Sequence, residues 1–143
     1  MATPTRWAPW IELPTQGNGV TFNTATTTAL TNAVVLVPDL DCRVVVHCLV
    51  DVECTVFNPG GGYFTAALYV GGTIVANVPT FRWQAPAHGE RMTWGWSVPY
   101  DMTKETSYSF DLRGTLSATG ATYVVASGYT TSIGPFVVLP RLW

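Results

Sequence analysis

The stretch CRVVVHCLVDVECTV, residues 42–56, constrains the fold more than any other part of the chain, because apolar residues occupy every second position. In a β-strand, successive side chains point to opposite faces of the sheet. The even positions of this stretch are all valine or cysteine: Cys42, Val44, Val46, Cys48, Val50, Val52, Cys54 and Val56. The odd positions are mixed in character. The pattern predicts one long strand, which a bulge could bend, with its even face in the core.

The same stretch holds all the cysteines and also His47, Asp51 and Glu53, so it invites a metal-site or disulfide interpretation. Cysteines six residues apart on one strand lie about 20 Å apart, whereas a disulfide needs Cα atoms within about 7 Å. Zinc ligands typically lie about two to four residues apart. We therefore expect the cysteines to be reduced, small buried hydrophobes, with no metal and no cofactor bound. The odd face is expected to be a solvated or inter-subunit polar face.

The rest of the chain also reads as strands separated by turns rich in glycine, proline and asparagine. Gly71-Gly72 between two β-rich runs predicts a tight hairpin over 64–78. Residues 91–98 and 106–116 alternate, and PYDMTKE (99–105) is predicted to be a turn between them. Further strands are expected at 31–37, 121–126 and 136–139, with a weak strand or a loop at 20–30. About eight strands and no helical stripe predict an all-β, antiparallel, jelly-roll-like sandwich or barrel. An immunoglobulin-like sandwich is the alternative, although its Cys…Trp…Cys spacing is absent.

Residues 1–17 differ in composition from the domain that we expect over 18–143. Pro4, Pro9 and Pro14 recur at five-residue intervals, which favours an extended arm without a helix. Both ends of the chain carry large apolar residues, although chain termini are normally polar and frayed. We therefore predict that the ends form an assembly interface, with these residues as its anchors: Trp7, Trp10, Ile11, Leu13, Leu142 and Trp143.

Candidates for ligand chemistry are few. Trp94 and Trp96 share a strand face with Met92 and Val98, so core packing is expected for both. The better candidates for an exposed receptor or ligand site lie in or beside predicted loops: Trp83, His88, Tyr100 and Asp101. His88 and Glu90 stand in one short loop, which does not supply a positioned acid–base pair.

Charge argues against several classes of partner. The net charge is −2, so no basic field attracts nucleic acid or an anionic membrane. Charged residues make up only 11% of the chain, against roughly 25% in a typical soluble domain. Such a surface favours association. The sequence contains no apolar run long enough to predict a membrane-spanning helix. The segment MATPTRWAPWIELP lacks the apolar core of a signal peptide, so we expect synthesis in a host cytoplasm.

The Pro-rich arm, the long valine-rich strand, ALYVGGTIV, SYSFDLRGTLSATGATYVV and the closing VVLP resemble small jelly-roll virion proteins of tailed bacteriophages. These include head decoration (cement) proteins and the tips of tail fibres, which are similar to the trimeric tumour-necrosis-factor-like jelly roll. The resemblance implies a non-enzymatic homotrimer on the particle surface, bound to the major capsid protein or other virion proteins. The alternative is a tail receptor-binding tip that recognises a host glycan. A glycan-active enzyme would need a carboxylate pair in a cleft, which the sequence does not indicate.

Overall fold

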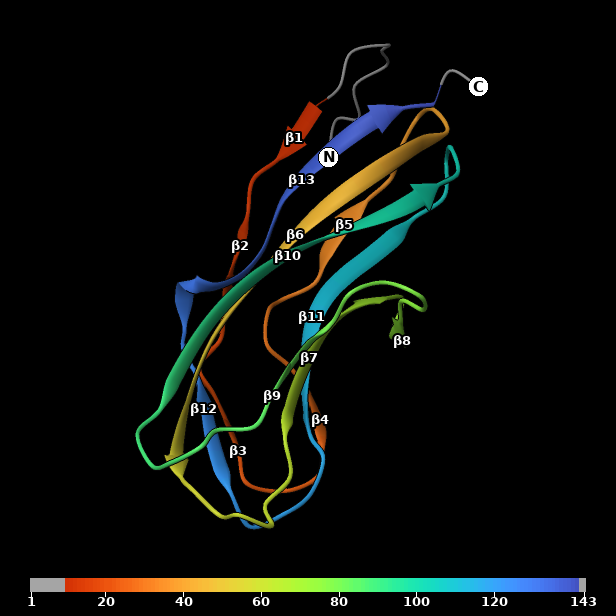
Figure 1. Ribbon diagram of the computed structural model, residues 1–143. Coiled ribbons are helices and arrows are strands. Elements are labelled where there is room, and N and C mark those ends of the chain that lie inside the picture. The colour runs from red at the N-terminus through yellow and green to blue at the C-terminus, as the bar shows by residue number, and fades with distance from the viewer. Residues whose placement is uncertain (1–9, 142–143) are drawn as a thin grey trace.

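The computed structural model describes residues 10–141 of the chain, without the side chain of Trp10 (Figure 1). In this range every regular element is a β-strand, and the strands form two antiparallel sheets of seven and six strands. No helix in the described range is long and apolar enough to cross a membrane. The prediction of an all-β sandwich is therefore confirmed.

Sheet A is the seven-stranded sheet, and it is built around the 15-residue strand β6 (Cys42–Val56). Strand β10 pairs with β6 on one side, while β13 and β12 share its other side. Short strands extend the sheet further: β1 and β2 pair with β13, and β3 pairs with β12. The bounds are β10 Arg91–Met102, β13 Gly128–Pro140, β12 Thr122–Val125, β1 Trp10–Glu12, β2 Thr15–Gly17 and β3 Val20–Phe22.

Sheet B is the six-stranded sheet, and its centre is the pair β7 and β11. Strands β4 and β5 pair with the far side of β11, and β8 and β9 pair with the far side of β7. The bounds are β7 Phe64–Val70, β11 Tyr108–Leu116, β4 Thr27–Ala29, β5 Val34–Leu36, β8 Thr73–Ile74 and β9 Phe81–Trp83.

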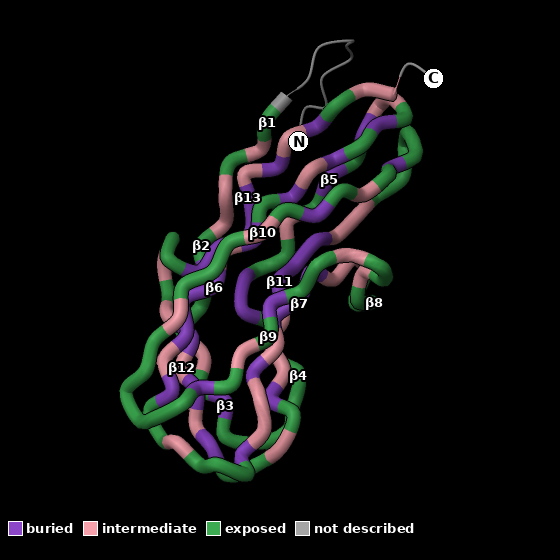
Figure 2. Tube along the Cα trace, in the orientation of Figure 1, coloured by how far each residue is buried: buried purple, intermediate pink, exposed green. Residues whose placement is uncertain are grey.

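The core lies between the sheets and uses the even face of β6, as the alternation predicts. Every even position from Cys42 to Cys54 is buried, and only Val56 at the strand end is exposed. Aromatic rings of sheet B fill the space opposite; for example, Phe110 meets Phe136 of β13 edge-on at 5.5 Å between ring centroids. Buried positions concentrate along β6, β7 and β11 (Figure 2). The cysteines are free and buried, so their interpretation as small core residues is confirmed.

The strand count exceeds the expected eight because short strands also form in the predicted arm (β1 and β2), in the segment expected as a weak strand or loop (β3 and β4) and at 81–83 (β9). In chain order the strands fall into the groups β1–β2, β4–β5, β6, β7, β8–β9, β10, β11 and β12–β13, with β3 in addition. Sheet A contains the groups β1–β2, β6, β10 and β12–β13, and sheet B contains the groups β4–β5, β7, β8–β9 and β11. This interleaving matches a double-sheet jelly roll in outline.

The Gly71-Gly72 hairpin is confirmed. Tyr69 pairs with Ile74 and Val70 with Thr73 across it. Both turn residues have positive φ, 59° at Gly71 and 80° at Gly72, which glycine adopts without steric cost. The second strand of the hairpin is shorter than expected and ends at Ile74.

Two strand boundaries correct the sequence-based prediction. Strand β10 continues through Pro99, Tyr100 and Asp101, which were expected to form a turn. Proline is tolerated there because β10 pairs only with β6 and forms an edge of sheet A, so its missing N–H disrupts no second ladder. Strand β13 begins at Gly128 rather than at Phe136, with register shifts along its pairing with β6.

The described part of the arm belongs to the domain's own sheet. Strands β1 and β2 lie within residues 10–17 and pair with β13, with Ile11 opposite Val137. Gly17 packs so closely that a Cβ would stand 2.5 Å from the carbonyl oxygen of Thr131. Residues 10–17 therefore cover an edge of sheet A. The predicted anchors Trp7, Leu142 and Trp143 lie outside the described residues.

Candidate functional site

Two surfaces collect the residues that could contact a partner. The first, called here the outer face, is the side of sheet A that carries the odd positions of β6. The second, called the seam, is the open border between the edge strand β10 and the strands β8 and β9 of sheet B.

An apolar row crosses the outer face over four strands. Pro99 of β10 lies opposite Val45 of β6, Val45 lies opposite Val137 of β13, and Val137 lies opposite Ile11 of β1. Side chains in register on one sheet face are neighbours. Ile11 is 62% exposed and Leu139, two residues along β13, is 40% exposed. The row is therefore a continuous hydrophobic band that faces outward.

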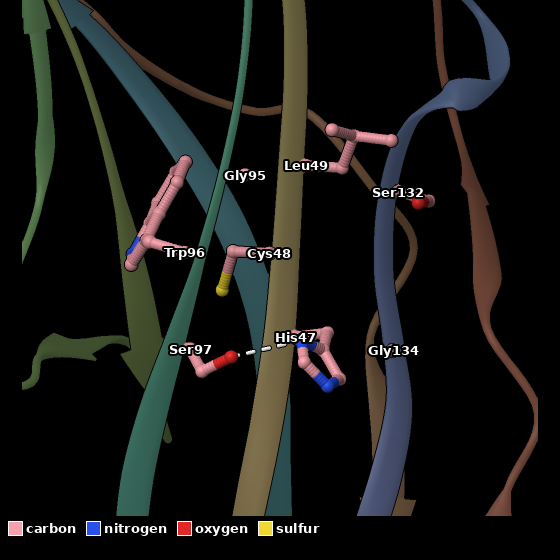
Figure 3. Close-up of a pocket in the computed structure, with 8 residues that line it drawn as sticks. All are labelled: His47, Cys48, Leu49, Gly95, Trp96, Ser97, Ser132 and Gly134. Carbon is pink, nitrogen blue, oxygen red and sulfur yellow. Dashed lines mark hydrogen bonds between the residues drawn. The ribbon is translucent and has the colours of Figure 1, made fainter.

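A depression of about 420 Å³ adjoins this row (Figure 3). Gly95 and Gly134 contribute no side chain, which leaves His47 and Leu49 of β6 standing between lower walls. Gly134 has φ 107°, and a Cβ there would stand 2.7 Å from the Cα of Pro14, so this position requires glycine. The fold itself thus keeps the depression open.

The most polar contact in the depression joins Ser97 and His47. Ser97 Oγ lies 2.8 Å from Nδ1 of His47, across β10 and β6 (Figure 3). Among the described residues, no carboxylate hydrogen-bonds to this ring to orient it as a base in a nucleophilic triad. His47 is exposed, as expected for the odd face, and its ring can still bond a partner.

Asp51, further along the same face, corrects the expectation of a solvated odd face. Its side chain is 4% exposed and accepts two hydrogen bonds from Arg91 of β10. These bonds from Arg91 hold the pKa of the Asp51 carboxyl below its usual value. Thr131 supports the same segment, since its Oγ1 accepts from the backbone N–H of Asp51 at 3.0 Å. The buried Asp51 carboxylate thus forms a partly buried ion pair that joins β6 to β10.

The lower groove of the seam, about 350 Å³, holds two tryptophans. Its lining residues are Thr80, Phe81, Arg82, Trp83, Met92 and Trp94. Trp94 is on the inward face of β10, yet 54% of it is exposed, so the expectation of core packing is wrong for this residue. The reason is that β10 is an edge strand, whose inward face extends past the cover of sheet B.

Two aromatic contacts fix the walls and floor of the lower groove. Trp96, as expected, packs against the core, and it stacks on Phe81 with 6.3 Å between centroids and 17° between planes. Trp83 is half-buried and meets Tyr123 edge-on at 5.8 Å. Trp83 is therefore held firmly, and it is less exposed than the sequence suggested.

The upper groove of the seam, about 390 Å³, contains Tyr100 and Asp101. Tyr100 meets Tyr108 and Phe110 edge-on, which anchors its ring against the core. Asp101 binds Arg43 at 2.7 Å, and this bond lowers the pKa of its carboxyl. Both residues lie on β10, not in the expected loop.

The seam thus gathers three of the four residues predicted for a ligand loop, in two separate grooves. His88 is not among them. Its Nδ1 accepts a hydrogen bond from the backbone N–H of Phe57 at 2.9 Å, which connects the His88 loop to the residue that follows β6. Trp94 and Met92 also line the lower groove, although both were expected to pack in the core. Pro99 was the available signal, since proline within an alternating run marks an edge strand.

Within residues 10–141, no cluster of three or more histidine, cysteine, aspartate or glutamate side chains is arranged to hold a metal ion. Comparison of the chain with protein-family models and with curated proteins found no match.

Proposed function

We propose that the protein is a non-enzymatic structural subunit of a virus particle, which assembles by packing the outer face of sheet A against a neighbouring subunit. The observation that carries this proposal is the apolar row from Pro99 through Val45 and Val137 to Ile11. The apolar surface of such a band stays exposed to water unless a partner covers it.

The surroundings of the row suit an interface. The depression beside it offers a concavity that a side chain of the partner can fill, and His47 and Ser97 offer polar contacts within it. Specific interfaces typically combine an apolar centre with a few hydrogen bonds. Leu13, 79% exposed directly after β1, extends the apolar surface along the arm.

The resemblance of the sequence to virion proteins of tailed bacteriophages supports the wider context. In this proposal the chain is a capsid decoration protein, a homotrimer displayed on the particle surface and attached to the major capsid protein. The predicted anchors at both chain ends would add to that attachment.

Sedimentation equilibrium at about tens of micromolar protein tests the interface. The variants Ile11→Asp and Leu139→Asp place a charge in the apolar row and beside it, respectively, at exposed positions, so the fold is expected to survive. We expect the wild type to be a trimer and both variants to dissociate. The control is Val35→Asp, a 53% exposed valine of sheet B, which should leave the trimer intact. A monomeric wild type, or a trimer that both variants retain, would contradict the proposal.

A receptor-binding module is the second candidate function, and the lower groove of the seam is the observation that favours it. A half-exposed tryptophan opposite a second tryptophan is a feature of ligand sites.

A further inference from the structure

We infer that the lower groove of the seam is a carbohydrate-binding site, in which Trp83 and Trp94 contact the faces of a neutral pyranose ring. This inference rests on the second candidate function, the receptor-binding module, and does not depend on the assembly proposal. The outer face uses the odd positions of β6, whereas Trp94 pairs with Val50 on the opposite, core-facing side of sheet A.

The groove is built before any ligand arrives. Trp83 rests on Tyr123, and the floor is closed by Phe81, which is buried and stacked on Trp96. Strand β9 carries Trp83 and strand β10 carries Trp94, so each wall belongs to a different sheet. Rigid walls reduce the conformational entropy that binding would otherwise cost. The volume of about 350 Å³ lies in the range of roughly 300–1,000 Å³ that ligand pockets occupy.

The openness of the groove selects an amphipathic ligand. Trp94 remains 54% exposed, so a bound molecule keeps part of its rim in water while its faces contact the indole rings. A pyranose with equatorial hydroxyls has this character, because its ring faces carry C–H bonds and its rim carries hydroxyls. The rim can bond water and the hydroxyl of Thr80, which also lines the groove.

The charge of the lining argues against other classes of ligand that bind to aromatic side chains. The indole faces could attract an organic cation, but the one charged residue of the lining is the cationic Arg82, and no carboxylate in the lining offsets its repulsion. The Arg82 guanidinium lies 3.6 Å from the centroid of the Tyr63 ring, where it is already stacked. Single-stranded nucleic acid needs a basic channel in addition to stacking, and this chain has a net charge of −2. Of these ligand classes, a neutral sugar fits the lining best.

Binding to an immobilised array of defined oligosaccharides tests the inference with the full chain. The array should span neutral hexose, N-acetylated hexosamine and uronic-acid oligomers, and hits should be confirmed by titration with tryptophan fluorescence. We expect neutral oligomers to bind, and Trp94→Ala to weaken binding at least about tenfold, which corresponds to 1.4 kcal/mol. Trp83→Phe should weaken it less, because an aromatic face remains.

The matched control is Tyr129→Ala, which removes a 59% exposed aromatic residue outside the seam and should leave binding unchanged. Thermal unfolding of each variant separates lost binding from lost folding. The inference is overturned if no oligosaccharide binds, if only uronic-acid oligomers bind, or if Trp94→Ala binds like the wild type. It is also overturned if the Pro-rich peptide MATPTRWAPWIELP, tested in parallel, binds in a Trp94-dependent manner while the sugars do not. Ile11→Asp should bind sugar normally, so failure of the assembly proposal can be recognised separately.

Discussion

Arg91 lies directly opposite Glu53 in the pairing of β10 with β6, yet its guanidinium reaches diagonally to Asp51. Nε donates to Oδ1 at 2.7 Å and Nη2 donates to Oδ2 at 2.5 Å, which is a two-point contact of arginine with carboxylate. Asp51 is nearly inaccessible while Arg91 is 58% exposed, so the carboxylate depends on this partner more than the guanidinium does.

Replacing Arg91 with methionine should therefore destabilise the fold. The substitution keeps much of the aliphatic packing but leaves the Asp51 carboxylate buried without its main donors. We expect a loss of about 1–3 kcal/mol in the free energy of unfolding, measured by urea denaturation. The control is Arg43→Met, which breaks the ion pair with Asp101, where both side chains are about half exposed (47% and 46%). Its cost should stay below about 1 kcal/mol, and equal losses in the two variants would refute the special role of Asp51.

The same pair should make stability depend on acid pH. The folded-state pKa of Asp51 is below its unfolded value of about 3.9, because Arg91 bonds the charged form. Its contribution is therefore complete above the unfolded pKa and is lost as the pH falls through the folded pKa. We expect the stability difference between wild type and Arg91→Met, followed by urea denaturation from pH 7 to pH 2, to shrink below about pH 4. A difference that stays constant would show that Asp51 does not carry it.

The core thiols should be unreactive in the folded protein. Burial raises the pKa of Cys42 to about 11 and that of Cys48 to about 12, and it also raises the pKa of Cys54. A thiol reagent at pH 8 should label none of them natively and three per chain in denaturant. The folded-state pKa values of these thiols exceed the usual 9.0, so burying them in the neutral form contributes to stability. That contribution is complete below pH 9.0 and is lost as the pH rises above it. Fewer than three thiols in denaturant would point to a disulfide or a modification.

The docking of β2 on β13 can be tested at Gly17. A Cβ there would stand 2.5 Å from the carbonyl oxygen of Thr131 and 2.9 Å from its Cβ, so Gly17→Ala should push the two strands apart. We expect a loss of about 1–3 kcal/mol, read as a lower midpoint of thermal unfolding. Gly95→Ala is the control, because its nearest neighbour would be Leu49 Cδ1 at an ordinary 3.5 Å. Equal midpoints for wild type and Gly17→Ala would mean that β2 packs loosely. Deletion of residues 1–17 should also lower the midpoint, since it removes both strands that pair with the edge of β13.

Several parts of the fold could be predicted because they depend on local information. The alternation of Val44, Val46, Val50 and their neighbours identifies one buried face, since a strand has a period of two whatever it packs against. The Gly71-Gly72 turn could be predicted because positive φ is a property of the residues themselves. Spacing along one strand likewise excluded disulfides among Cys42, Cys48 and Cys54.

The candidate sites were decided by tertiary structure. Trp94 and Trp96 have the same alternation and face inward together, but only the edge position of β10 and the limited reach of sheet B leave Trp94 open to solvent. Asp51 looks like a solvated acid in the sequence, and only the placement of Arg91 on the neighbouring strand makes it a buried partner. The period of a strand thus determined which side chains share a face, whereas the pairing of strands distant in sequence decided what, if anything, covers that face, because cross-strand register and sheet edges arise from long-range contacts.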